Sequence, residues 1–86
     1  MNAPDLKAAS VALRVALDEL ARAHRDAAGV CAVYANALAL EQGVAEARRA
    51  HLAAEMRCLV AGQAVRQATR EFDTAEAHAR MAGEIP

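Results

Sequence analysis

The chain has 86 residues, a formal net charge of −1 and 56% apolar residues. This length permits one domain at most, near the size at which a single core barely offsets chain entropy. The near-neutral charge excludes a whole-chain field that would attract nucleic acid or an anionic membrane. Alanine makes up 25 of the 48 apolar residues. Because alanine buries little surface, we expect part of the buried area to come from another chain.

The first predicted helix runs from about residue 4 to residue 42. Pro4 and Asp5 suit a first helical turn, where the acidic side chain lies near the positive end of the helix dipole. From there, apolar and small residues recur at alternating spacings of three and four, as in a coiled coil. They are Leu13, Leu17, Leu20, His24, Ala27, Cys31, Tyr34 and Leu38. Gly29 interrupts this series at a cost of only about 1 kcal/mol, so we predict one continuous helix; a break there, giving three helices, is the alternative.

The segment Glu41, Gln42 and Gly43 is the predicted turn. Glycine readily takes the left-handed conformation that follows many helix ends. We therefore expect Gly43 to end the first helix and to let the chain fold back.

The second predicted helix runs from about residue 44 to residue 82 and has a more regular heptad pattern. One series of positions seven residues apart is Val44, His51, Cys58, Val65, Phe72 and Ala79. The series three residues later is Ala47, Ala54, Ala61, Ala68, Ala75 and Ala82. Because the alanine side chain is small, two backbones can approach closely at these positions, and the series predicts a closely packed neighbouring helix. The alanine bias of a high-GC genome is the alternative explanation. Gly83 and Pro86 are expected to end the helix, which leaves residues 83–86 as a short tail.

The predicted fold class is all-α, a single domain over residues 1–86 that forms an antiparallel two-helix hairpin turning at Gly43. A hairpin buries one stripe of each helix, but near the turn apolar residues occupy further stripes, and a surplus of this kind typically marks an interface. We therefore predict that two hairpins dimerise into a four-helix bundle. The predicted partner interface is Val30, Val33, Tyr34, Leu38, Leu40, Leu52, Met56, Leu59 and Val60. A third helix that packs back within the chain is the alternative.

Candidate catalytic and metal-binding groups are sparse. His24, Cys31, His51 and Cys58 fall on predicted seam positions, but the histidine and the cysteine of each helix are seven residues apart, about 10.5 Å. Four ligands spread that far cannot share one tetrahedral ion. A disulfide between the two cysteines requires a register shift of one turn. We predict no catalytic residue, no metal and no cofactor, and hence no enzyme.

The expected location follows from the lack of membrane and targeting signals. No apolar run reaches the length that spans a bilayer, and no charged-then-apolar segment opens the chain. We expect synthesis in the cytoplasm, and any secretion without a cleaved signal peptide. Residues 46–70 carry five arginines and two glutamates, but the whole chain has only one Tyr and one Phe. Such a sequence offers few stacking aromatics, so nucleic acid is not an expected partner.

Three features of the chain point to a known family. They are an opening Pro-Asp-Leu, helices on both sides of a turn near residue 42, and the late segment "REFDTAEAHA". With them the chain resembles the WxG family of type VII secretion substrates, in which the turn carries Trp-x-Gly and a Tyr-x-x-x-Asp/Glu export signal follows the second helix. Gly43 matches the turn glycine, Glu41 replaces the tryptophan, and Phe72 with Glu76 corresponds to the export signal. The resemblance implies an antiparallel four-helix dimer with a role in secretion.

Two functions follow as hypotheses. In the first, the chain is a secretion-associated hairpin that pairs with a second hairpin, identical or related, or with the helical head of a toxin. In the alternative, it is a cytosolic homodimeric adaptor or inhibitor, phage- or plasmid-encoded, that binds a host protein through the apolar patch near the turn. Both hypotheses require a protein partner.

Overall fold

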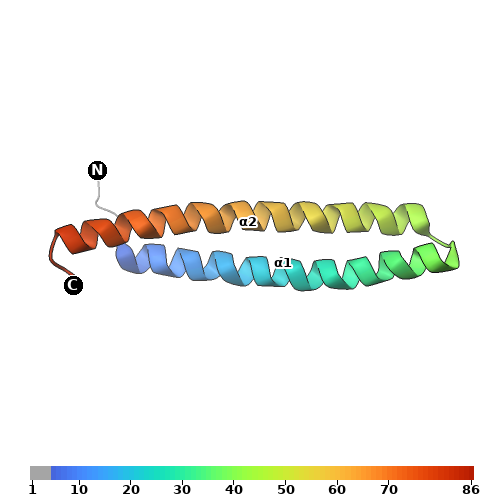
Figure 1. Ribbon diagram of the computed structural model, residues 1–86, viewed down its shortest axis with the longest axis horizontal. Helices are drawn as coiled ribbons and strands as arrows, with labels where there is room; N and C mark the ends of the chain where they lie inside the picture. The colour runs from blue at the N-terminus through green and yellow to red at the C-terminus, as the bar shows by residue number, and fades with distance from the viewer. Residues whose placement is uncertain (1–4) are drawn as a thin grey trace.

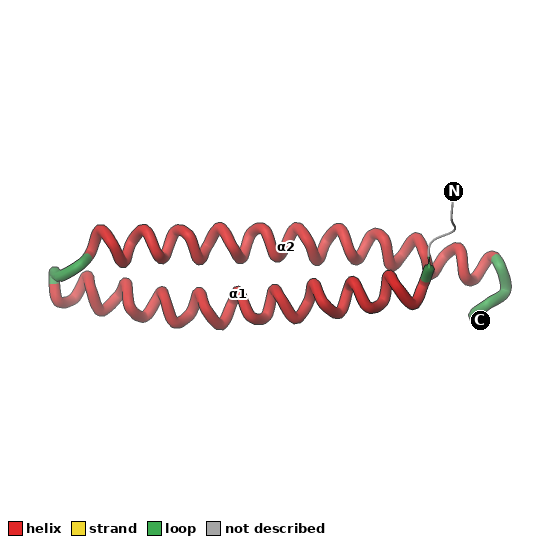
Figure 2. Tube along the Cα trace, turned by 180° about the vertical axis from the view of Figure 1, so that it is seen from behind, coloured by secondary structure: helices red, strands yellow, loops and turns green. Residues whose placement is uncertain are grey.

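The computed structural model describes residues 5–86, which form two helices, α1 (Leu6–Leu40) and α2 (Val44–Met81). The helices lie side by side and antiparallel, so the link between them stands at one end of the rod and the C-terminus at the other (Figure 1). No strand occurs within residues 5–86, and the link and the C-terminal tail are the irregular segments that follow α1 and α2 (Figure 2). The two-helix, all-α prediction is therefore confirmed.

The start and course of α1 follow local rules. Asp5 is the residue before the helix, and its side-chain oxygen accepts a hydrogen bond from the Lys7 N–H at 3.0 Å, which satisfies one of the free amides of the first turn. The prediction that Asp5 belongs to the first helical turn is therefore corrected, because its extended backbone places it just before the helix, which begins at Leu6. Pro4, the predicted first residue, lies outside the described residues. α1 continues through Gly29 without a break, so the three-helix alternative is wrong.

The end of α1 corrects one prediction. The left-handed residue that ends the helix is Glu41, with φ 56°, and the helix stops at Leu40 instead of residue 42. The Glu41 N–H donates to the Leu38 carbonyl at 3.3 Å, and the Gln42 N–H donates to the Ala37 carbonyl at 3.2 Å. These two bonds form a Schellman motif, which requires a left-handed residue immediately after the helix. Gly43 is also left-handed, with φ 65°, but it precedes α2.

The end of α2 uses the same motif with the expected residue. Gly83 has φ 75°; its N–H donates to the Arg80 carbonyl at 3.1 Å, and the Glu84 N–H donates to the Ala79 carbonyl at 2.9 Å. The helix ends at Met81, one residue before the predicted limit. The two ends of the hairpin thus differ in that glutamate at one end occupies the position that glycine holds at the other.

The two helices meet along a seam of buried and half-buried residues, which we call the inner seam. On α1 it contains Leu6, Ala9, Leu13, Ala16, Leu20, Ala23, Ala27, Val30, Tyr34 and Ala37. On α2 it contains Val44, Ala47, His51, Ala54, Cys58, Ala61, Val65, Ala68, Phe72, Ala75 and Ala79. Among residues 5–86, every residue that is buried is an alanine. The α2 prediction is confirmed at all these positions, whereas Ala82, which lies beyond the helix end, is exposed.

The prediction for α1 is wrong at every second position. Leu17, His24, Cys31 and Leu38 are exposed, and their places in the inner seam are taken by Ala16, Ala23, Val30 and Ala37. The exposed series and the series that replaces it both have the heptad spacing. The exposed series was the one predicted because its side chains are larger. Because α2 presents an alanine every seventh residue, the helices can approach closely, and close approach leaves room only for small side chains opposite. Steric fit to α2 therefore outweighs the size of the side chain that could be buried.

This seam leaves much of the chain exposed. The rod measures 62 × 22 × 13 Å and exposes 6433 Å². A compact monomer of 9.1 kDa exposes about 4,900 Å². The chain therefore carries about 1,500 Å² of surface beyond the value for a compact fold of its mass. Neither helix has a stretch apolar enough to cross a membrane, within the residues that the structure describes.

Candidate interaction surface

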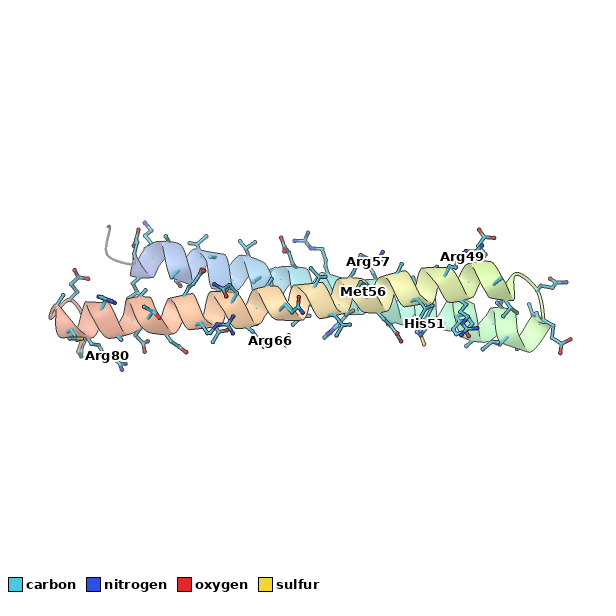
Figure 3. All side chains as sticks on the ribbon, turned by 90° about the horizontal axis from the view of Figure 1, so that it is seen from above. Arg49, His51, Met56, Arg57, Arg66 and Arg80 are labelled. Carbon is cyan, nitrogen blue, oxygen red and sulfur yellow. The ribbon has the colours of Figure 1, made fainter. Side chains whose placement is uncertain are left out.

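The exposed surface has two long sides, one on each side of the inner seam. On α2, Arg49 and Arg57 project to one side and Arg66 to the other (Figure 3). Leu52 and Leu59 are spaced by sevens from Arg66, so they share its side. On α1, Val33 lines a hollow together with Arg57. The α1 positions across the inner seam from Val33 therefore belong to the Arg66 side.

The Arg66 side of α1 carries a second heptad stripe, which we call the outer seam. It consists of Leu17, Ala21, His24, Ala28, Cys31, Ala35 and Leu38, at alternating spacings of four and three, and all of them are exposed. No Asp, Glu, Lys or Arg lies in this stripe, which spans 22 residues, or about 33 Å of helix. It repeats the design of the inner seam, since an alanine alternates with a larger side chain. Next to it on α2 lie the exposed Leu52 and Leu59.

The opposite side, which we call the groove face, is less uniform. Three shallow hollows follow it from the link toward the middle of the rod, and the one nearest the link has a volume of about 460 Å³. Exposed apolar side chains on this face are Val33, Leu40, Met56 and Val60. Charged side chains, among them Glu19, Asp26, Glu46 and Arg57, also line the hollows. The groove face therefore mixes apolar and charged groups along both helices. On the opposite side the charged Arg66 belongs to α2, and the outer seam of α1 contains no Asp, Glu, Lys or Arg.

The residues predicted as one interface patch are divided among three places. Val30 and Tyr34 are half-buried in the inner seam and belong to the contact between α1 and α2. Leu38, Leu52 and Leu59 lie on the side of the outer seam, and Val33, Leu40, Met56 and Val60 lie on the groove face. The prediction of a single patch near the turn is therefore corrected, because the inner seam separates its members.

An aromatic pair sets the alignment of the helices near the link. The rings of Tyr34 and His51 stack with centroids 5.1 Å apart and planes at 30°. His51 Nε2 lies 2.9 Å from Glu55 Oε1, one turn along α2. His51 Nδ1 is buried and has no hydrogen-bond partner among the described residues. The pair is part of the packing between the helices, and this alignment brings Ala28 of α1 close to the level of Leu59 of α2.

The remaining candidate groups are the histidines, the cysteines and the export-signal-like pair. Within residues 5–86, no three His, Cys, Asp or Glu side chains come close enough to hold a metal ion. Cys31 is an exposed free thiol and Cys58 a half-buried one. The export-signal-like pair lies inside α2, where Phe72 is half-buried in the inner seam and Glu76 forms an ion pair with Arg80 at 3.6 Å.

Of the seven residues of the outer seam, the sequence predicted only Leu38 as interface. It assigned Leu17, His24 and Cys31 to the contact between the two helices and did not indicate the three alanines Ala21, Ala28 and Ala35. The signal was present, because these alanines are seven residues apart and no charged residue interrupts the stripe that contains them. Comparison of the chain with protein-family models, with curated proteins and with solved structures found no match. The surface itself is therefore the basis for an argument about function.

Proposed function

We propose that this chain is a non-enzymatic interaction module, a helical hairpin that associates with another helical chain to form a four-helix bundle. The observation that carries the proposal is the outer seam. A stripe that spans 22 residues of helix without an Asp, Glu, Lys or Arg is ordinarily buried, because apolar heptad positions of a helix pack against a neighbouring helix. Within residues 5–86, the chain covers the inner seam and leaves the outer seam exposed.

The exposed area supports the same proposal. The hairpin exposes 6433 Å², about 1,500 Å² more than a compact monomer of its mass. A standard protein interface buries about 800 Å² of each partner. The outer seam and the leucines beside it lie about 100° around each helix from the inner seam, which is the direction in which a four-helix bundle places the next helix.

The resemblance to the WxG family extends the proposal to a cellular role. In that family helical hairpins pair as antiparallel four-helix dimers and serve type VII secretion. We therefore propose that the chain is made in the cytoplasm and pairs there with a hairpin or with the helical head of a toxin. Export of such a complex requires no cleaved signal peptide.

The test uses neighbouring residues that point to opposite sides. Leu59, 61% exposed, lies beside the outer seam, and Val60, 57% exposed, lies on the groove face. We expect Leu59→Asp to abolish association, as measured by sedimentation equilibrium, while helicity by circular dichroism persists; Leu38→Asp is expected to do the same. Val60→Asp is the matched control and should leave the mass unchanged. A chain that sediments as a cooperatively folded monomer at all concentrations would refute the proposal.

The groove face supports a second candidate, a cytosolic adaptor or inhibitor that dimerises and binds a host protein near the turn. Val33, Leu40 and the hollow that they line would remain accessible after the outer seam is covered. In this case Leu40→Asp should abolish host-protein binding without changing the mass of the dimer. Neighbouring genes discriminate the two candidates: a secretion ATPase or a related hairpin supports the first, and phage genes support the second.

A further inference from the structure

We infer that the outer seam binds the outer seam of a second copy of this chain, with the two α1 helices antiparallel and a two-fold axis beside Ala28. The inference rests on the proposed function, to which it adds the identity of the partner and the register of the contact.

The side chains of the outer seam are arranged symmetrically about Ala28. Leu17 and Leu38 lie at the two ends, Ala21 and Ala35 come next, and His24 and Cys31 flank the centre. A two-fold interface requires this symmetry, because each residue that contacts a position of the partner is contacted by that position in return. In antiparallel pairing Leu17 faces Leu38 of the second copy, Ala21 faces Ala35, and Ala28 faces its own equivalent.

The inner seam supplies a precedent for this geometry in the same molecule. There, α1 and α2 also run antiparallel, with alanine alternating with larger side chains and with Tyr34 stacked on His51. The outer seam has the same alternation, so the same close approach of two helices fits it. A partner helix with large side chains at every seam position would be held away by its own bulk and would leave the alanines uncovered.

The flanking residues agree with this register. Arg14 precedes Ala21 by seven residues and so continues the stripe beyond Leu17. In the symmetric pair it lies opposite the link of the second copy, where Glu41 offers the opposite charge. On α2, Leu59 is close to the level of Ala28, so it meets Leu59 of the second copy near the same axis. The axis therefore brings apolar groups together at its centre and opposite charges together at the ends.

A cysteine scan tests the register directly. In a chain carrying Cys31→Ser and Cys58→Ser, Ala28→Cys places two thiols on opposite sides of the two-fold axis. We expect the two Cα atoms of residue 28 to lie within the range of about 4.4–6.8 Å that a disulfide requires. We expect mild oxidation to yield a covalent dimer of twice 9.1 kDa. Ala32→Cys is the matched control. Ala32 is exposed, but its two copies in the dimer are about 12 Å apart along the direction of the helices. It should cross-link at least tenfold more slowly.

A second variant protects the test against an unfavourable geometry at a single site. His24→Cys, with Cys31 retained and Cys58 replaced by serine, places two thiol pairs in contact, because residue 24 faces Cys31 of the second copy. Within one chain these two residues are seven positions apart, about 10.5 Å, which is too far for an intramolecular disulfide. We expect a dimer joined by two disulfides, and the chain with Cys31 alone should not cross-link.

The outcomes separate this inference from the proposed function. If the chain is a dimer but Ala28→Cys and Ala32→Cys cross-link equally, the register is wrong and the proposed function stands. If the isolated chain sediments at 9.1 kDa and is largely unfolded, a different partner covers the outer seam, and only this inference fails. If it sediments at 9.1 kDa as a cooperatively folded monomer, both fail.

Discussion

The two seams of α1 are alike in sequence and differ in burial. The inner seam alternates Leu13, Ala16, Leu20 and Ala23, and the outer seam alternates Leu17, Ala21, His24 and Ala28. Both have coiled-coil spacing, and both place an alanine at every seventh residue, except that Val30 takes this place once in the inner seam. α2 covers the first, and the described chain leaves the second exposed. The comparison teaches that a heptad pattern predicts which stripes of a helix can pack, but not which of them a given neighbour covers.

The choice between the stripes is made by the shape of α2. Its alanines at 47, 54, 61, 68 and 75 allow close approach. In the inner seam of α1, alanine or valine occupies every seventh position, and Leu or Tyr occupies most positions between them. Leu17 and Leu38 would hold the helices apart at the levels where α2 is smallest. Leu17 and Leu38 are therefore left on the surface while alanines are buried, the reverse of the usual expectation for a core.

The largest expected effect comes from adding bulk to one seam and then to the other. Ala54 is 1% exposed in the inner seam, so Ala54→Leu should lower the free energy of unfolding by about 3 kcal/mol through overpacking. Ala28→Leu, on the outer seam, should leave the hairpin helical and weaken association instead. Urea unfolding at one fixed chain concentration and sedimentation equilibrium measure the two effects. Equal loss of unfolding free energy in both variants would remove the distinction between the seams.

A second comparison places a charge on either side of α1. Leu17 and Val15 are 49% and 50% exposed and point to opposite sides. Leu17 is already about half covered, so burying the rest of it contributes about 1 kcal/mol at each of the two equivalent contacts of the dimer. Leu17→Asp should therefore weaken association by at least about 30-fold, as should Leu38→Asp at the other end of the same contact. Val15→Asp should change the dissociation constant by less than threefold. An effect of Val15→Asp as large as that of Leu17→Asp would place the interface on the groove face.

The end of α1 allows the inner contact to be strengthened without touching either seam. Glu41 takes a left-handed conformation with φ 56°, in which a residue with a Cβ is strained by roughly 1–2 kcal/mol. Glu41→Gly should therefore raise the free energy of unfolding by roughly 0.5–1 kcal/mol after the added chain entropy is subtracted. Gly83→Ala, at the equivalent position after α2, should lower it by about 1 kcal/mol. Thermal unfolding at matched concentrations measures both changes, and a loss of stability in Glu41→Gly would argue against the left-handed cap.

The smallest expected effect gives the baseline for helix stability alone. Gly29 lies inside α1, and a Cβ at this position would contact nothing within 4 Å. Gly29→Ala should add up to about 1 kcal/mol to the free energy of unfolding, with no change in the register of cross-linking. Gly43→Ala also meets open space but has φ 65°, so it should be destabilising. A gain of stability at both positions would show that the left-handed link is not required.

The sequence by itself determined the elements of this protein and the contact face of α2. Helix periodicity, the tolerance of Gly29 and the stop at Gly83 are local properties, so they could be predicted from neighbouring residues alone. The burial of the alanine series of α2 could be predicted because alanine recurs without interruption at the same heptad position, at residues 47, 54, 61, 68 and 75.

Only the tertiary structure decided which stripe of α1 lies inward and how the apolar surplus is divided between two sides. Val30 and Tyr34 pack in the inner seam. Leu38 and Leu59 lie on the side of the outer seam, and Leu40 and Val60 lie on the groove face. The tertiary structure also decided that Glu41, not Gly43, ends α1. The physical reason is that spacing is a property of one helix, whereas burial depends on the fit between the side chains of two helices.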